Sequence, residues 1–391
     1  MRSPSTGRGF KGPDTAADTT GATGKRLLTA KLPTIDELLA ETQAASASDL
    51  HLKAGIPPTI RVDGDLRALP QPPLTDAEVE AYLGSVMPDR LHVEFKEKHE
   101  ADFAYGMEDG SRFRVNAFRQ RGQVTVALRA LRPPSGDFGS LGLPPVLTRL
   151  AAARRGLILV TGPTGAGKST TLASLVDWIN SNRRVNIITV EDPVEFVHHD
   201  KMAMISQREV GVDTGSFAEA MRRVIRQDPD VILIGEMRDV ETIDAALKAA
   251  ATGHLVLSSL HTLNATETIN RIIDFFSPEH QHQIRLLLAG SLKAILSQRL
   301  IPTANGKGRV PAVEMLVNTD RVAERIADPS ITHEIPDVIA EGSYYGMETF
   351  DQAILRLVAN GTIAFDEAMH NATNPGDLKL RAQQLGLVEA K

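Results

Sequence analysis

Hydrophobic and polar positions alternate along several short stretches in the first third of the chain. The stretches that predict strands with one buried face are residues 49–53, 58–62, 111–119 and 123–131. Asp63-Gly64 and Arg121-Gly122 stand between such runs, and each pair predicts a hairpin turn. Periodic apolar positions over 33–46 and 75–100 predict helices. We therefore expect a small α+β domain over residues 31–132.

Continuous apolar runs replace this alternation in the middle of the chain, where they predict strands buried on both faces. The runs are Leu157–Thr161, Val185–Val190, Val231–Ile234 and Leu255–Leu260. Helical patterns separate them, and alternating strands and helices predict a mainly parallel sheet with helices on both faces. The expected order is a linker rich in Pro and Gly at 133–143, an α/β domain over 144–310 and a helical region over 311–391. Residues 1–30, rich in Gly, Ser and Thr, predict a disordered tail.

Composition narrows the class of protein. The 391 residues include no cysteine, which excludes a disulfide framework, a cysteine zinc site and a thiol nucleophile. No apolar stretch is long enough to span a membrane, and the N-terminus lacks the apolar segment of a secretory signal. We expect a cytoplasmic protein. A formal net charge of -6 argues against general electrostatic binding to nucleic acid.

A phosphate-binding motif follows the apolar run that ends at Thr161. Residues 162–169 match G-x-x-x-x-G-K-[ST] in full, and a helical pattern follows them. The glycines let backbone N–H groups face an anion at a helix N-terminus, Lys168 is placed to reach the β- and γ-phosphates, and Ser169 to hold Mg²⁺. The predicted nucleotide-binding residues are Gly162, Pro163, Thr164, Gly165, Ala166, Gly167, Lys168, Ser169 and Thr170. ATP and Mg²⁺ are the expected cofactors.

Acidic residues end two of the predicted buried strands. Glu236 follows the strand at 231–234, at the edge of an open α/β sheet where ligands bind, so we assign it with Ser169 to the Mg²⁺ site. Glu191 follows the strand that ends at Val190, and Pro193 stops that strand. A carboxylate beside phosphates is suited to water and metal, not to phosphate itself, so Glu191 is the candidate that orients the attacking water.

Two histidines frame the apolar strand at 255–260. His254 precedes it and His261 follows it, and we expect both to contact the γ-phosphate or the acidic cluster. A zinc site is a weaker interpretation, because no further ligand accompanies them at a suitable spacing.

These segments together resemble the motor ATPases of secretion systems and type IV pili. The matching parts are the phosphate loop, an acidic box at Ile188–Glu195, an atypical Walker B segment at Gly235–Asp239 and a histidine box at Gly253–Thr262. Within that superfamily the chain most resembles the pilus retraction ATPases. The resemblance implies a PAS-like domain over 31–132, a RecA-like ATPase domain over 144–310, and ATP held between them.

The same resemblance gives a role to three arginines. Arg112 and Arg114 correspond to family arginines that approach the γ-phosphate from the small domain, and Arg226 is a second such candidate. It also implies a homo-hexamer that acts on an inner-membrane pilus platform protein, with paralogous pilus ATPases as further partners. The implied location is the inner face of the cytoplasmic membrane.

One segment departs from the retraction pattern. Family members usually carry a helix close to A-I-R-N-L-I-R-E, and residues 320–328 keep its amphipathic character but not its motif. Residues 346–353 match well. Retraction is therefore the first interpretation, with a pilus assembly or type II secretion motor as the alternative. A nucleic-acid translocase and a nucleotide sensor that does not hydrolyse ATP are further alternatives.

Overall fold

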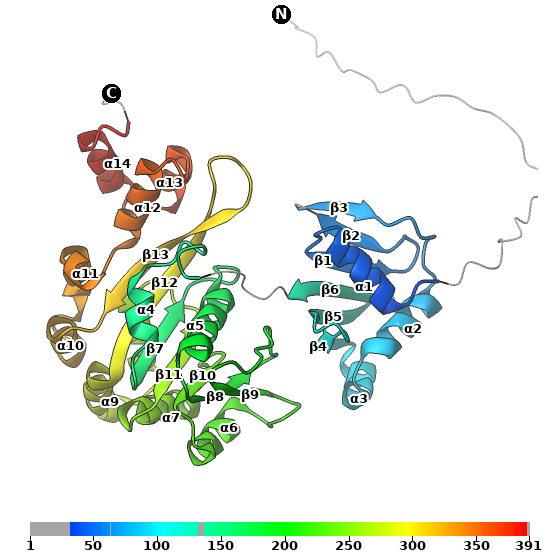
Figure 1. Cartoon of the computed structure of the whole chain (residues 1–391), viewed down its shortest axis with the longest axis horizontal. Coiled ribbons are helices and arrows are strands. Elements are labelled where there is room, and N and C mark those ends of the chain that lie inside the picture. The colour runs from blue at the N-terminus through cyan, green and yellow to red at the C-terminus, as the bar shows by residue number, and fades with distance from the viewer. Residues whose placement is uncertain (1–31, 63, 132–136, 389–391) are drawn as a thin grey trace, which may run out of the picture.

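The computed structural model describes residues 32–62, 64–131 and 137–388, and it contains two separate sheets. In Figure 1 the smaller sheet, with its three helices, lies on the right and the larger one on the left. The disordered tail predicted for 1–30 falls outside the described residues, as does most of the first half of the predicted linker.

The small domain is an antiparallel sheet of six strands in the order β3-β2-β1-β6-β5-β4. The strands are β1 Asp49–Lys53, β2 Thr59–Val62, β3 Asp65–Ala68, β4 Glu100–Gly106, β5 Arg112–Gln120 and β6 Gln123–Leu131. Arg121 and Gly122 join β5 to β6 with φ of 51° and 82°, the positive values that a two-residue hairpin turn requires. The predicted α+β character is therefore present.

Three helices accompany this sheet: α1 Ile35–Ala44, α2 Asp76–Val86 and α3 Asp89–Lys98. Thr34 and Thr75 cap α1 and α2, each in a reciprocal capping box with the glutamate three residues later. The single helix predicted over 75–100 is in fact two helices, because Pro88 cannot continue the helix that ends at Val86. Leu38, Leu50 and Phe113 lie in the shared core.

The large domain has seven strands in the order β13-β12-β7-β11-β10-β8-β9. They are β7 Gly156–Thr161, β8 Asn186–Glu191, β9 Met204–Glu209, β10 Val231–Ile234, β11 Leu255–Leu260, β12 Leu292–Pro302 and β13 Arg309–Val317. All pair in parallel except β13, which pairs antiparallel with β12. The predicted mainly parallel sheet is thus confirmed, and its carboxyl edge gathers the ends of β7, β8, β10 and β11.

The helices α5, α6, α7 and α8 contact this sheet, while α4 packs on α5 and α9 packs on α7. The helices of this domain are α4 Val146–Ala151, α5 Lys168–Asn182, α6 Phe217–Val224 with the short η1 Ile225–Gln227, α7 Val240–Ala251, α8 Ala265–Asp274 and α9 Pro278–Ser291. The core between the layers is aliphatic; Leu157, Leu175 and Ile243 are fully buried within it.

The C-terminal region is helical only after Val317. Residues 311–317, the start of the predicted helical region, belong to β13 (Arg309–Val317), because the run from Ala312 to Val317 is buried along its whole length against β12. The helices that follow extend to the upper left in Figure 1. They are α10 Asp320–Ala327, η2 Thr332–Glu334, α11 Ile335–Glu341, η3 Ser343–Tyr345, α12 Phe350–Ala359, α13 Phe365–Asn371 and α14 Pro375–Gln384. None of the described helices is both long and apolar enough to cross a membrane.

Candidate functional site

The phosphate loop joins β7 to α5, in the strand–loop–helix order that its sequence predicts. Gly162, Gly165 and Gly167 have φ of 141°, 80° and 89°, a backbone region that residues with a side chain rarely adopt. At Gly162 the space is also closed, since an added Cβ would lie 2.5 Å from the carbonyl oxygen of Gln298 on β12. Ser169 and Thr170 lie in the first turn of α5, where backbone N–H groups are free to bind an anion.

Lys168 is buried at the start of α5 and folds back over the loop. Its Nζ donates hydrogen bonds to the carbonyl oxygens of Gly162 at 2.8 Å and Pro163 at 3.0 Å. Burial lowers the pKa of the ammonium group, and the carboxylates of Glu236 and Glu195 oppose that shift. These two glutamates are therefore the acidic groups that interact with the lysine of the loop.

Glu236 lies just past β10, at the carboxyl edge of the sheet. Its side chain is 16% exposed and has a basic side chain near each oxygen: Arg238 Nη2 lies 2.6 Å from Oε1 and His261 Nε2 lies 3.5 Å from Oε2. His261 follows β11, which pairs in parallel beside β10. The structure therefore brings Glu236 and His261 together.

Glu191 ends β8 on the same edge of the sheet. Its Oε1 accepts hydrogen bonds from Thr189 Oγ1 at 2.6 Å and Gln207 Nε2 at 3.2 Å. Burial nevertheless raises the pKa of this carboxyl, because these bonds offset only part of the cost of removing its charge from water. Counted along the sheet, Glu191 is three strands from the loop strand β7, about 14 Å at the usual strand spacing.

The two arginines of β5 have different partners. Arg112 extends to the large domain, where its Nη2 lies 3.2 Å from Oε2 of Glu209 at the end of β9. Arg114 stays within the small domain, 3.8 Å from Asp102 on β4, and is largely exposed. The structure therefore brings Arg112 to the strand beside Glu191 and leaves Arg114 outside that cluster.

His254 and Arg226 do not lie at the phosphate edge. His254 precedes β11, about 20 Å from His261 at the usual rise per strand residue, and its Nδ1 lies 3.0 Å from the carbonyl oxygen of Ala249 in α7. The expectation that His254 contacts the γ-phosphate is wrong for this chain, because residues flanking a strand lie at opposite edges of the sheet. Arg226, exposed in η1, likewise precedes the amino end of β10.

Sequence reasoning missed several polar partners of the site: Thr189, Gln207, Glu209, Arg238 and Gln298. Gln207 and Glu209 occupy alternate positions of β9, a polar strand whose side chains face the acidic end of β8. That alternation was visible in the chain, but nothing local shows which strand it faces.

Oxygen donors that suit Mg²⁺ are available at the loop. The hydroxyl of Ser169 and the carboxylate of Glu236 are hard ligands of the kind this ion takes alongside nucleotide phosphates and water. Among the described residues no group of three or more His, Asp or Glu side chains could enclose a metal by itself. The donor set therefore fits an ion that is carried with a nucleotide.

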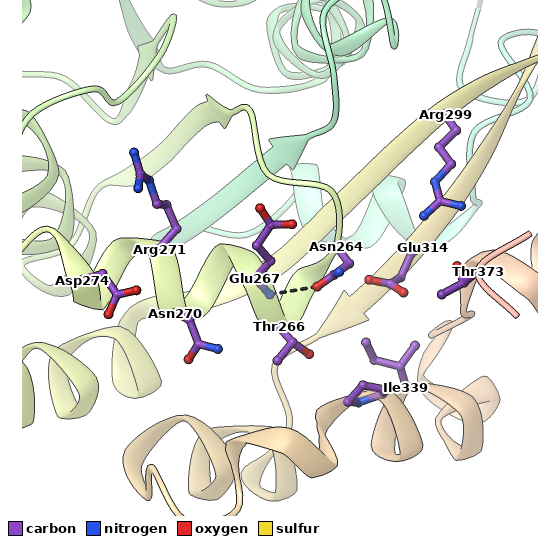
Figure 2. Close-up of a pocket in the computed structure, with 11 residues that line it drawn as sticks. Asn264, Thr266, Glu267, Asn270, Arg271, Asp274, Arg299, Glu314, Ile339 and Thr373 are labelled. Atoms are coloured by element: carbon purple, nitrogen blue, oxygen red, sulfur yellow. Dashed lines mark hydrogen bonds between the residues drawn. The ribbon is translucent and has the colours of Figure 1, made fainter. Parts of the chain in front are cut away.

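A separate cavity of about 490 Å³ lies away from the loop and contains none of the predicted site residues. Figure 2 shows it between α8, the paired strands β12 and β13 and the C-terminal helices. Arg299 and the buried Glu314 face each other there; Arg299 also lies 3.9 Å over the ring of Phe350 and donates to the carbonyl oxygen of Asn371. These contacts attach the C-terminal helices to the sheet, so we interpret the cluster as structural.

Known proteins match almost the whole described chain. The model of the type II/IV secretion system protein family matches residues 28–369. The type IV pilus retraction ATPase PilT of Pseudomonas aeruginosa is 44% identical over 341 residues, which cover 87% of this chain and 98% of that protein. A twitching motility protein of Neisseria gonorrhoeae is 42% identical over 81% of this chain and 84% of its own length.

A solved structure agrees with these matches. The crystal structure of the pilus retraction motor PilT with bound ADP superposes with a TM-score of 0.82 at 42% identity, covering 89% of this chain and 99% of that one. The similarity therefore extends over both sheets and most of the C-terminal helices.

Proposed function

The chain belongs to the type II/IV secretion system protein family, and we propose that it is a motor ATPase that powers the retraction of type IV pili. The observation that carries this proposal is the match to 98% of the length of a pilus retraction ATPase. A phosphate loop between a strand and a helix supports ATP as the substrate.

Hydrolysis requires a bound nucleotide, an oriented water and compensation of the charge that develops on the phosphates. In our proposal the loop amides and Lys168 hold the β- and γ-phosphates, and Glu191 orients the water that attacks in line. A raised pKa suits Glu191 to this role, because a carboxylate that is easier to protonate is a better acceptor for the proton of that water.

Mg²⁺ dependence is part of the proposal. Ser169 and Glu236 would hold the ion, which supplies charge compensation for the phosphates when it is bound. Arg238 and His261 fix the two oxygens of Glu236, so the carboxylate is oriented before any ligand arrives.

Arg112 and Arg114 are proposed to complete the site from the small domain. Arg112 already reaches the large domain, which supports its part more directly than that of Arg114. Arg226 is exposed at the far edge of the sheet, so in our proposal it would act on the nucleotide of another copy. We propose a homo-hexamer in which domain movements pass from subunit to subunit and on to a platform protein at the inner face of the cytoplasmic membrane, alongside paralogous pilus ATPases.

The activity and the direction of the motor are tested separately. Phosphate release from ATP by the purified chain tests hydrolysis, and its loss on chelation of Mg²⁺ tests the metal. A deletion strain with excess surface pili and no twitching supports retraction, whereas loss of surface pili indicates an assembly motor. ATPase activity strongly stimulated by DNA would indicate a translocase instead.

A further inference from the structure

The ion pair between Arg112 and Glu209 links the side chains of two domains. Arg112 lies on β5 of the small sheet and Glu209 at the end of β9, 97 positions later in the chain. The two side chains are only 24% and 13% exposed, so water screens this pair less than it screens the ion pairs on the surface.

Glu209 also holds the acidic turn that follows Glu191. The same oxygen that binds Arg112, Oε2, accepts a hydrogen bond at 3.1 Å from the backbone N–H of Val194. Glu209 lies directly opposite Glu191 in the register of β8 and β9. One carboxylate oxygen therefore contacts both the small domain and the turn between Glu191 and Glu195.

Gln207 fixes the other end of that turn from the same strand. Its Nε2 donates to Oε1 of Glu191 at 3.2 Å and to the carbonyl oxygen of Phe196 at 2.8 Å. Because β9 is held through both Gln207 and Glu209, a shift of Glu209 reaches the carboxylate of Glu191 through a short chain of hydrogen bonds.

The surroundings of the Arg112 side chain include an unused donor atom and a cavity. Its Nε is buried without a hydrogen-bond partner among the described residues. A cavity of about 450 Å³ surrounds the ion pair and is lined from both domains, by Arg90 and Gly106 on one side and by Val197 and Val212 on the other. The two domains are therefore not closely packed around this ion pair.

We propose that Glu209 is a positioning residue that couples the placement of the small domain, through Arg112, to the turn beside Glu191. The inference rests on the proposed ATP hydrolysis. When Arg112 moves with its domain, Glu209 and the backbone of Val194 move with it, and the water-orienting carboxylate is realigned.

A double-mutant cycle on ATP turnover tests this coupling. We expect Glu209→Gln, which keeps the size of the side chain and removes its charge, to lower kcat about tenfold and change KM for ATP less than about twofold. In an Arg112→Gln background the same change should lower kcat by only about twofold. Arg114→Gln is the matched control on the same strand, and in that background the full tenfold loss should remain.

Equal losses in all three backgrounds would overturn the inference, as would an unchanged kcat in Glu209→Gln. Absence of hydrolysis by the wild-type chain in the same assay would instead overturn the proposed function, so the two failures are distinguishable. If thermal unfolding shows that Glu209→Gln is not folded, Glu209→Asp replaces it with the same expectations. The shorter aspartate keeps the negative charge but withdraws the carboxylate from Arg112.

Discussion

The ammonium group of Lys168 donates a hydrogen bond to the carbonyl oxygen of Gly162 at 2.8 Å, within the loop that both residues frame. The loop carbonyls thus satisfy the buried lysine, and the opposing carboxylates retain its charge. In the proposed function, nucleotide phosphates would replace these carbonyls as the partners of the ammonium group. In the proposed function Lys168 is therefore already positioned at the loop where it would bind the phosphates.

Lys168→Ala should abolish ATP hydrolysis, with kcat/KM reduced at least about 10²-fold, because a buried cation that stabilises charge on the phosphates is lost. Steady-state phosphate release measures the effect. Lys248→Ala is the control: Lys248 has an exposed side chain on α7 that pairs with Asp244, so its removal should leave turnover unchanged. A Lys168→Ala protein with normal turnover would refute the loop assignment.

Glu191→Gln should lower kcat by about 10²–10⁴, the usual loss on removing a group that accepts a proton from water. The wild-type rate should fall on the acid side as Glu191 becomes protonated, at a pH above the ordinary range for glutamate because its pKa is raised. That acid limb should be missing from the residual activity of the variant. Glu314→Gln is the control, since Glu314 is also buried with a raised pKa but lies outside the site.

The same raised pKa predicts that the charged form of Glu191, which favours activity as the pH rises, lowers the stability of the fold. A glutamate whose pKa is higher in the folded state destabilises the fold once the pH exceeds its unfolded-state pKa, because the buried side chain must then be charged. The melting temperature of Glu191→Gln should therefore rise relative to wild type as the pH increases above about 4.5, the ordinary value for the group. A constant difference between pH 4 and 8 would contradict the burial argument.

The parts of the site that the sequence predicts are those specified by neighbouring residues. The phosphate loop needs only a strand, glycines and a helix in order, and Glu236 needs only the end of a buried strand. The partner of Arg112 was not predictable, because Glu209 lies 97 positions away and the two sheets meet only in the folded chain. β13 was missed since an apolar run without alternation fits a buried strand or a buried helix equally well.

The error at His254 has a different cause, because the chain did hold the information. A strand of six residues separates its flanking residues by about 20 Å, so His254 and His261 could not both reach one phosphate. His261→Ala should lower kcat about 10–100-fold through misorientation of Glu236, as is typical for a residue that orients an oxygen ligand. His254→Ala should leave kcat unchanged.

Thermal unfolding completes the comparison of the two histidines. A carbonyl oxygen can only accept, so Nδ1 of His254 donates to Ala249, and loss of that bond should cost about 0.5–1.5 kcal/mol of stability. His261 is more than half exposed and should affect stability less. A reduced kcat in His254→Ala with unchanged stability would reverse this assignment.

Gly162→Ala should both destabilise the chain and remove nucleotide binding, because two penalties coincide at this position. Its φ of 141° strains any residue with a side chain, and the new Cβ would meet the Gln298 carbonyl oxygen at 2.5 Å. That oxygen belongs to the backbone of β12, directly after the last residue of β12 that pairs with β7, so the paired strands limit how far either side can withdraw.

Gly253→Ala separates the two penalties. Gly253 also has a positive φ, 119°, but nothing lies within 4 Å of an added Cβ there. We expect the control to lose only the stability that the backbone strain costs, about 1–3 kcal/mol, and to hydrolyse ATP normally. Gly162→Ala should lose more stability than the control and should no longer bind a fluorescent ATP analogue. Equal stability losses in the two variants would show that the contact with β12 relaxes freely and that the loop is not held by its neighbouring strand.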